Sequence, residues 1–366
     1  KDTKKSKWLY NHWKYRCNYR IGRLTKLDII RPTLINYRKE DDYFSYSKLS
    51  TFLKDKVKYY KKFVLKDNSI DDDDETKELQ FGTMVDLFIT NEEDFDNKFA
   101  ILKELPSPQM RKFCNLVYKN MKNYKEFSEV LKQSYEDLKD WNGGKLKSGF
   151  KNFIENFDTD VPQEYFKNIL DEKIITDEVS RSKAYNIAKK VKSIKQFAPK
   201  SESSEIYRKF QIVFKLGEDK FGAEIDEFEV CHEEKKIYLY DYKTSSFLDN
   251  FIFMGFLKFN YYLQSSLYKF GLIEWAKNNL PGYTVENMAF KVMDSNNYME
   301  PLLFKTNDWH YESGFTGFFV GKKYYKGIIE IIEEIKESQK ENIWRMSIEN
   351  YKNKGIVNIP NFSKEW

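Results

Sequence analysis

Cysteine and histidine are scarce in this sequence. Its 366 residues include three of each, and all six are isolated along the chain: Cys17, Cys114, Cys231, His12, His232 and His310. None of them has the spacing of a zinc site. A run of 18 apolar residues is also absent, and the start is too polar for a secretory signal peptide. We therefore expect a soluble, cytoplasmic protein with no membrane partner.

A large excess of charge of one sign is missing as well. The 62 basic and 57 acidic residues nearly balance, at a net charge of +5, so no global basic field indicates a nucleic-acid partner. Any such surface must be local. The aromatic content of 17% supports a sizeable hydrophobic core. This length predicts two domains, with a single elaborated α/β unit as the alternative.

One local basic surface is expected in residues 1–42, where basic and aromatic side chains lie close together. Trp8, Trp13, Arg16 and Arg20 belong to this arm. Such side chains can neutralise phosphates and stack on bases. The alternative is an arm that packs its aromatics on the body of the protein and solvates its charges. No apolar period decides between the two interpretations.

The most informative stretch runs from residue 221 to residue 244. In its second half, Ile237, Leu239, Asp241 and Lys243 occupy every other position and would point to one face of a strand. The three tyrosines between them would point to the other face. An apolar face that ends in Asp and Lys predicts a strand that leads out of a core into a site.

The first half of this stretch predicts the partner strand of a hairpin. Pairing Val230 with Ile237 places Asp226 directly opposite Asp241. Like charges opposed across a ladder destabilise it by roughly 0.2–1 kcal/mol. A cation is therefore expected between them, and carboxylate oxygens suit a divalent ion. A hairpin with solvated charges is the alternative.

Alternation along the partner strand predicts its two faces. One face would hold Phe221, Ala223 and Ile225, and the other would hold Glu224, Asp226, Phe228 and Val230. An earlier strand alternates in the same way over residues 210–216, and a turn at residues 217–220 joins it to the partner strand. Together the three strands predict an antiparallel meander.

Helical periods precede these strands. A helix is expected from Tyr46, with Ser47 as its cap, and a second helix is expected to begin at Gly82. Residues 106–198 are helical by period and contain no residue pattern that suggests chemistry. These helices are interpreted as scaffold.

A further helix is predicted over residues 256–276. Three of its polar residues are spaced four apart and would share one face: Asn260, Gln264 and Tyr268. Because an unpaired buried amide costs about 1–3 kcal/mol, this polar face needs partners or a substrate. Strands near residues 288–293 and 301–304, followed by an amphipathic helix around residues 328–335, complete the expected elements.

These residues form motifs that resemble a known family. Gly222-x-x-x-Asp226 and Asp241-Tyr242-Lys243-Thr244 are similar to the core of the PD-(D/E)XK nucleases, in the RecB-like and phage-exonuclease branch. Gln264-x-x-x-Tyr268 resembles the QxxxY motif of that branch. Gly82-Thr83-Met84-Val85-Asp86 resembles its GxxxH motif, with Asp in place of His. The three motifs occur in the family order.

The resemblance is nearest to the RecE-like (exonuclease VIII-like) proteins and covers residues 43–346. It implies an α/β fold like that of restriction endonucleases, in which helices flank a mixed central sheet. A helical N-terminal subdomain would span residues 43–200, and a catalytic core would span residues 201–346. The arm of residues 1–42 and a tail of residues 347–366 fall outside it.

The resemblance also implies Mg²⁺- or Mn²⁺-dependent hydrolysis of DNA, with one or two ions. The groups that would hold the ions are Asp226, Asp241, Glu205 and the carbonyl of Tyr242, with Asp86 as a weaker ligand. Lys243 would orient or deprotonate the attacking water. The residues that would bind the substrate are Gln264, Tyr268, Thr244 and Asn260. Three cysteines cannot supply the four thiolates of the iron–sulfur cluster that some RecB-like nucleases carry.

By the same resemblance, the activity would be that of an exonuclease acting 5′ to 3′ on duplex ends in phage-type recombination. A single-strand annealing protein and a homo-oligomer are the further partners it suggests, and the cytoplasm would be that of a phage host. Two alternatives stay open. One is a nuclease-fold protein that has lost catalysis and binds nucleic acid or a partner. The other is a non-nuclease α/β protein whose hairpin only mimics the motif.

Overall fold

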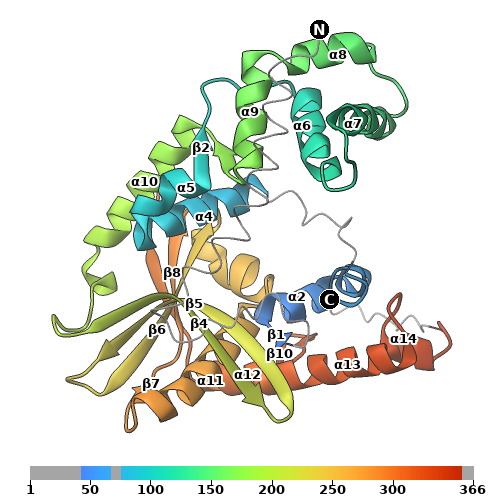
Figure 1. The fold of residues 1–366 in the computed structure, drawn as a ribbon. Helices are drawn as coiled ribbons and strands as arrows, with labels where there is room; N and C mark the ends of the chain where they lie inside the picture. Colours follow the sequence, from blue (N-terminus) through green and yellow to red (C-terminus); the bar gives the residue numbers. More distant parts are fainter. Residues whose placement is uncertain (1–42, 67–75, 357–366) are drawn as a thin grey trace, which may run out of the picture. The chain divides into compact units, whose positions relative to one another are not determined.

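The computed structural model describes residues 43–66 and 76–356, which form a mixed α/β protein (Figure 1). The predicted basic arm lies outside these residues. The described chain divides into a smaller unit, within residues 83–186, and a larger unit made of the residues before and after it. Helices α4 (Lys77–Thr90) and α10 (Glu178–Ser193) cross the boundaries between them.

The smaller unit is mostly helical, as its periods predicted. Its further elements are α5 (Phe95–Lys98), β2 (Phe99–Ile101), α6 (Pro108–Asn120), α7 (Phe127–Trp141), α8 (Phe150–Phe157), α9 (Asp160–Leu170) and β3 (Ile174–Thr176). Phe113, Phe157 and Phe166 are buried where α6, α8 and α9 meet. The strand pair β2 and β3 was not predicted. Each strand has only three residues, which is too short for a period to show.

The larger unit is built on a seven-stranded mixed sheet. Its strands are β1 (Tyr43–Phe44), β4 (Glu205–Leu216), β5 (Asp219–Cys231), β6 (Lys236–Ser245), β7 (Thr284–Val285), β8 (Ala289–Asp294) and β9 (Leu302–Lys305). β4 pairs with one edge of β5, and β1 and β6 share the other edge. β6 then continues in parallel with β8, which pairs with β9. The predicted mixed sheet and the predicted meander are confirmed.

The register of the hairpin between β5 and β6 is the predicted one. Val230 pairs with Ile237, and the last pair of the ladder is Glu227 with Tyr240. Beyond that pair β6 leaves β5 and stays with β8. Asp226 therefore lies at a fork between strands: β5 pairs with β6 only from Glu227 onward, and with β1 only at Lys220 and Phe221.

The predicted faces of β5 are wrong after Ile225. Tyr207 and Phe210, three positions apart on β4, both contact Trp275, and Phe228 of β5 contacts the same ring. Regular alternation would separate Tyr207 from Phe210. Lys209, which lies between them, has a left-handed φ of 49°, and the alternation changes by one residue at this point. Phe228 consequently joins Ile225 in one core.

Helices cover the core face of the sheet. α11 (Tyr261–Asn279) packs against β4 and β5, and α12 (Asp308–Thr316) packs on α11. α13 (Ile328–Glu341) buries its predicted isoleucines against α2 (Tyr46–Lys54). The opposite face is crossed by residues 195–200, where the Lys200 N–H donates to Glu229. The larger unit is thus a sheet flanked by helices, as predicted.

Three predicted helix boundaries are wrong. Ser45, not Ser47, caps α2, because its side chain accepts the N–H of Lys48. Gly82 lies within α4, which begins at Lys77. The helix predicted over residues 256–276 is interrupted, since Asn260 has a φ of 61° and α11 begins only after it. The left-handed conformation of Asn260 separates α11 from the π-helix η5 (Ile252–Leu257).

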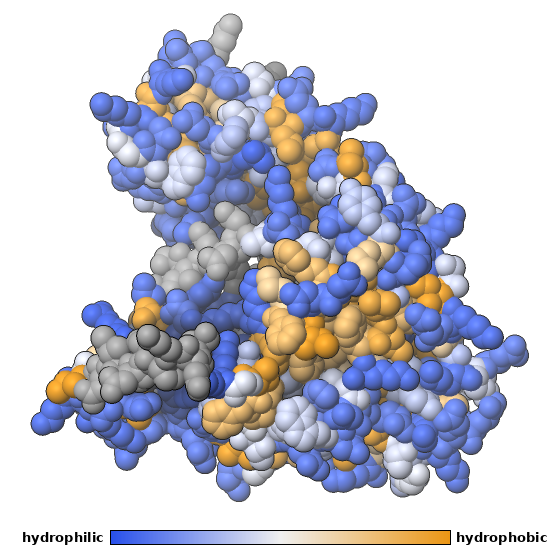
Figure 2. All heavy atoms as spheres, turned by 180° about the vertical axis from the view of Figure 1, so that it is seen from behind, coloured by the Kyte–Doolittle hydropathy of each residue, from blue (hydrophilic) through white to orange (hydrophobic). Residues whose placement is uncertain are grey.

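The surface mixes hydrophobic and hydrophilic side chains. Figure 2 shows a broad hydrophobic area on the face that is turned away in Figure 1. In the larger unit, Phe247, Ile252 and Phe253 are each more than half exposed. None of the helices in residues 43–66 and 76–356 has both the length and the hydrophobicity needed to cross a bilayer.

Candidate active site

Two carboxylates meet at the fork between β5 and β6. Asp241 of β6 is 1% exposed, and Asp226 of β5 acts on it through its charge and through a side-chain hydrogen bond. The backbone N–H of Tyr242 donates to Oδ2 of Asp226 over 3.2 Å. This contact joins the two strands after their ladder has ended. The predicted opposition of Asp226 and Asp241 thus places their side chains together.

Each carboxylate of this acidic pair has a lysine beside it. Nζ of Lys243 lies 2.5 Å from Oδ2 of Asp241 and 4.7 Å from the centre of the Tyr261 ring. Nζ of Lys209 lies 2.8 Å from Oδ1 of Asp226. Lys209 is half exposed, whereas Lys243 is largely buried. Two positive charges therefore balance the two carboxylates within the protein itself.

Gln264 supports the pair from α11. Its Nε2 donates to Oδ1 of Asp241 over 2.7 Å, and its side chain is buried. The other amide atom, Oε1, is buried and has no hydrogen-bond partner among the described residues. Buried polar atoms normally have a partner, so an unpaired one needs an explanation, such as water, an ion or a substrate. Tyr268, one turn later on α11, is also buried.

The two carboxyl groups differ in proton affinity. Burial raises the pKa of Asp241 to about 7, and the negative charge of Asp226 adds to this rise, while Lys243 opposes it. The pKa of Asp226 is lowered. Its burial opposes the change, but the charges of Lys209 and Lys243 outweigh it. The two carboxyl groups titrate as a coupled pair, in which Asp241 holds a proton more tightly than Asp226 does.

Lys243 keeps its positive charge in this environment. Burial alone would lower the pKa of its ammonium group, but the negative charge of Asp241 and the neighbouring Tyr261 and Asp226 outweigh burial and raise it. A charged ammonium donates hydrogen bonds and accepts none. This charged state fits the first role predicted for Lys243, orienting the attacking water, and both predicted roles stay predictions.

Glu205 does not join the acidic pair. It is the first residue of β4 and pairs with Val230, four positions along β5 from Asp226. Four positions in a strand correspond to about 13 Å. Its carboxylate instead accepts the hydroxyl of Tyr207 over 2.6 Å and lies 3.2 Å from Nε2 of His232. The predicted convergence of three carboxylates is wrong. In residues 43–66 and 76–356, no group of three His, Cys, Asp or Glu side chains is arranged to hold a metal ion.

The remaining predicted residues have mixed outcomes. Thr244 lies close to Gly82, where an added Cβ would meet its Oγ1 at 3.1 Å. The prediction that Asn260 shares a helical face with Gln264 is wrong, because Asn260 precedes α11 and has a positive φ. Asp86 belongs to the smaller unit, and its role as a metal ligand stays a prediction.

Three residues near the pair were not predicted. Burial raises the pKa of Tyr46, and the nearby Lys243, Tyr268 and Asp241 also influence this pKa. The Tyr46 hydroxyl donates to the carbonyl of Phe259 over 2.6 Å. The others are Tyr261 and Lys209. Their sequence signals were available: Tyr261 is three residues before Gln264, on the same helical face, and a tight turn at residues 217–218 brings Lys209 opposite Asp226.

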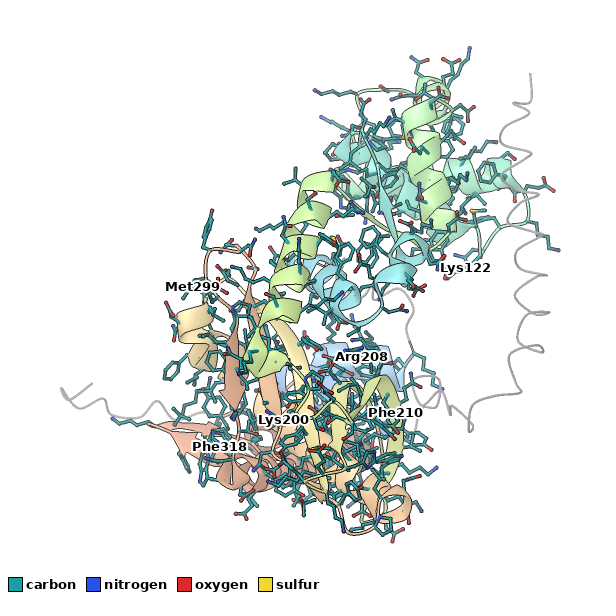
Figure 3. All side chains as sticks on the ribbon, turned by 90° about the vertical axis from the view of Figure 1, so that its left-hand side faces the viewer. Lys122, Lys200, Arg208, Phe210, Met299 and Phe318 are labelled. Atoms are coloured by element: carbon teal, nitrogen blue, oxygen red, sulfur yellow. The ribbon has the colours of Figure 1, made fainter. Side chains whose placement is uncertain are left out.

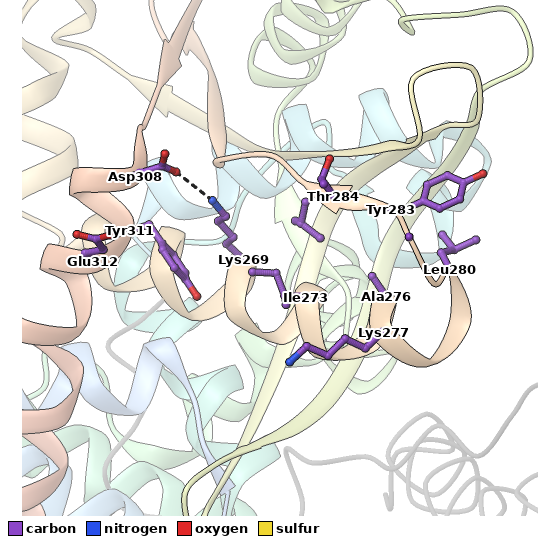
Figure 4. A pocket seen from close by; sticks show the side chains of 12 residues that line it. Lys269, Ile273, Ala276, Lys277, Leu280, Tyr283, Thr284, Asp308, Tyr311 and Glu312 are labelled. Carbon is purple, nitrogen blue, oxygen red and sulfur yellow. Dashed lines mark hydrogen bonds and ion pairs between the residues drawn. The ribbon is translucent and has the colours of Figure 1, made fainter.

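A pocket of about 510 Å³ lies beside α11, β7 and α12 (Figure 4). Lys269 lies at its edge, 2.7 Å from Oδ1 of Asn287 and 3.5 Å from Oδ1 of Asp308. Its ammonium also lies over the ring of Tyr311. No predicted site residue lines this pocket. The acidic pair instead brings together residues of two of the sequence motifs, Asp241 and Lys243 of the first and Gln264 of the second.

Comparison with known proteins adds little to this geometry. No protein-family model matches the sequence, and no curated protein matches it. Among solved structures, the chain is similar to a Eubacterium rectale protein described as a "Putative exonuclease", with 12% identity and a TM-score of 0.40. The similarity covers 90% of this chain and 89% of that chain. A likeness this weak assigns neither a family nor a function to this chain.

Proposed function

We propose that this protein is a Mg²⁺- or Mn²⁺-dependent nuclease that hydrolyses phosphodiester bonds in DNA. The observation that supports it is the arrangement of Asp226, Asp241 and Lys243 at the fork between β5 and β6, with Gln264 bonded to Asp241. The motif resemblance favours a restriction-endonuclease-like fold and a finer activity, that of an exonuclease degrading duplex ends 5′ to 3′ in phage-type recombination. A cytoplasmic location, an annealing-protein partner and a homo-oligomer belong to the same proposal.

The donor set fits a hard divalent cation. The two carboxylates and the carbonyl of Tyr242 offer oxygen atoms, which Mg²⁺ prefers. Oδ2 of Asp241 is buried, and the Lys243 ammonium lies 2.5 Å from it. A bound ion would neutralise charge on the phosphate and lower the pKa of a coordinated water. Glu205 has no place in this set.

The chain's own side chains would divide the remaining work. Lys243 would donate hydrogen bonds to the attacking water or to a phosphate oxygen, because its ammonium stays charged. Gln264 would hold the Asp241 carboxylate in one orientation through its 2.7 Å bond. Tyr261 would keep bulk water from Lys243, since its ring faces the ammonium. Gln264 and Tyr268 would position the cut strand.

The test is cleavage of a linear duplex labelled at either its 5′ or its 3′ end. We expect degradation in Mg²⁺ or Mn²⁺, none in EDTA, and binding with little turnover in Ca²⁺, whose bonds are longer and geometry looser. Asp241→Asn should abolish degradation. Asp219→Asn, at the other end of β5 and paired with Lys336, is the matched control and should cut normally. Equal cleavage in Ca²⁺ and Mg²⁺ would contradict a metal at the chemistry.

A second function is favoured by one observation. The two carboxylates are already balanced by Lys209 and Lys243, and the third predicted carboxylate is absent from the site. A nuclease-fold protein that has lost catalysis and only binds DNA would look the same. Wild-type protein that binds the duplex but cuts it in neither Mg²⁺ nor Mn²⁺ would establish this alternative. Protein that neither binds nor cuts would favour an unrelated α/β function.

A further inference from the structure

A buried polar network lies directly behind the acidic pair. Its centre is Glu227, which follows Asp226 on β5 and is 4% exposed. Three side chains from three other strands donate to its carboxylate: Arg208 of β4 over 2.9 Å, the Tyr242 hydroxyl of β6 over 2.9 Å, and Lys291 of β8 over 2.7 Å. Figure 3 labels Arg208 on this sheet. One carboxylate thus ties four strands together.

The network lies where backbone pairing stops. The ladder between β5 and β6 ends at Glu227 and Tyr240, so no backbone ladder holds Asp241 to Asp226. Two hydrogen bonds from Tyr242 hold the two strands together at this point instead. Its N–H donates to Asp226, and its hydroxyl donates to Glu227. Because Asp241 and Lys243 are its immediate neighbours, the position of Tyr242 sets where both of them lie relative to β5.

We propose that the hydrogen bond between Tyr242 and Glu227 is a positioning device that sets the separation of Asp226 and Asp241. Through this separation it controls the affinity of the pair for a divalent cation. Neither side chain touches the substrate in this role, and the inference rests on the proposed nuclease function. Partners of metal ligands commonly act in this way, and their loss costs roughly 10–100-fold in metal affinity or activity.

A purely structural role for the network makes a different prediction. Lys291 is 2% exposed, and removing its partner would leave a buried charge unpaired, which destabilises a fold strongly. Stability should then depend mainly on the Glu227–Lys291 ion pair. Metal affinity, in our proposal, depends mainly on the Tyr242 hydroxyl. The two roles can therefore be separated by two variants.

Tyr242→Phe removes the hydroxyl and keeps the ring. Tyr240→Phe is the matched control, because Tyr240 lies two residues earlier on the same strand and its hydroxyl makes no hydrogen bond among the described residues. For Tyr242→Phe, we expect the calorimetric Kd for Mn²⁺ to rise roughly 10–100-fold. The single-turnover cleavage rate should fall at limiting Mg²⁺, with the KM for duplex DNA unchanged. Tyr240→Phe should match wild type in all three measurements.

Glu227→Gln separates positioning from stability. Its amide oxygen can still accept the Tyr242 hydroxyl, but the charge opposite Lys291 is lost. We expect a larger fall in melting temperature in EDTA than for Tyr242→Phe, together with a smaller loss of Mn²⁺ affinity. A larger loss of Mn²⁺ affinity in Glu227→Gln than in Tyr242→Phe would overturn the proposal. If Glu227→Gln does not fold, the Kd for Mn²⁺ of Tyr242→Phe, compared with that of Tyr240→Phe, tests the proposal by itself.

The outcomes also separate this inference from the proposed function. Wild-type protein that binds Mn²⁺ and cuts DNA, beside a Tyr242→Phe variant with the same Mn²⁺ affinity and rate, overturns the positioning role and leaves the nuclease intact. Wild-type protein that neither binds Mn²⁺ nor cuts DNA overturns both. A rise in Kd for Mn²⁺ in Tyr242→Phe but not in Tyr240→Phe supports the positioning role, even if cleavage is slow.

Discussion

The ammonium of Lys209 lies 2.8 Å from the carboxylate of Asp226, across the ladder between β4 and β5. The flanking pairs, Arg208 with Glu227 and Phe210 with Ile225, place Lys209 opposite Asp226. The φ of Lys209, 49°, is unusual for a residue with a side chain. The ammonium of Lys209 therefore occupies one side of the acidic pair, where the proposed function would also place a divalent ion.

Lys209→Ala should strengthen divalent binding and weaken the metal-free fold. Removing the ammonium eliminates a competitor for Asp226, so the Kd for Mn²⁺ should fall several-fold. The metal-free protein should lose about 0.2–1 kcal/mol of stability, since the pair is partly exposed. Calorimetry and urea unfolding in EDTA measure the two effects. Lys215→Ala, an exposed lysine on the same strand, is the control. Unchanged Mn²⁺ affinity in Lys209→Ala would show that the two cations do not compete.

Lys243→Ala should lower single-turnover cleavage of a linear duplex by roughly 10²–10⁴-fold, the range for a lost group that handles protons or orients water. DNA affinity measured in Ca²⁺ should change little, because one lysine is a small part of a phosphate-binding surface. Lys243→Arg keeps the charge and should retain part of the rate. A variant that loses DNA binding and keeps its rate at saturating DNA would assign Lys243 to the binding surface instead.

The stability of the metal-free protein should depend on pH through Asp241. Burial raises the pKa of this carboxyl to about 7, from about 3.9 in an unfolded chain. A raised pKa favours the protonated folded state, so this contribution is complete below pH ~4 and is lost as pH rises through about 7. The pKa values of Asp226 and Glu227 are lowered, so their contributions change only below this window.

Urea unfolding in EDTA at several pH values between 4 and 8 measures this effect. Asp241→Asn cannot ionise, and the difference in stability between wild type and this variant should change across the window. Mn²⁺ affinity of the wild type should rise over the same range, because the ion must displace the proton. A wild-type and variant pair with parallel pH profiles would contradict the raised pKa.

Gln264→Ala should destabilise the metal-free protein by about 1–3 kcal/mol, because it leaves the buried Oδ1 of Asp241 without its donor. Gln211→Ala is a matched control: Gln211 also donates to a carboxylate on this sheet, that of Glu224, but is only half buried. Gln211→Ala should lower the stability of the protein by less than Gln264→Ala does. Equal losses in the two variants would show that burial of the Asp241 bond does not matter.

Local patterns predicted the parts of this fold that depend on neighbours in sequence. The β5–β6 register followed from Val230 and Ile237, and the alternation on β6 identified Asp241 and Lys243 as neighbours on one face. The same reasoning failed for Phe228, because the left-handed φ of Lys209 leaves no trace in a hydrophobic pattern.

Contacts between distant strands were beyond such patterns. Glu205 matched a motif by its place in sequence, yet the β4 ladder carries it to the far end of β5. The bond between Glu227 and Lys291 joins residues that become neighbours only after β6 has paired with β8. The periodicity of side chains within β5 or β8 does not predict the pairing of β6 with β8. A buried Lys in an otherwise apolar strand was the one available hint.

The position of β1 has a consequence for how the molecule assembles. Tyr43 pairs with Lys220, and the whole unit of residues 83–186 is synthesised between them. β4, β5 and β6 are joined by short turns, so their contacts close small loops, whereas β1 must close a very large one. We expect the meander to form first and β1 to dock late, bringing Tyr46 towards Lys243. In the order of folding, Tyr46 is therefore expected to be among the last residues to reach the site.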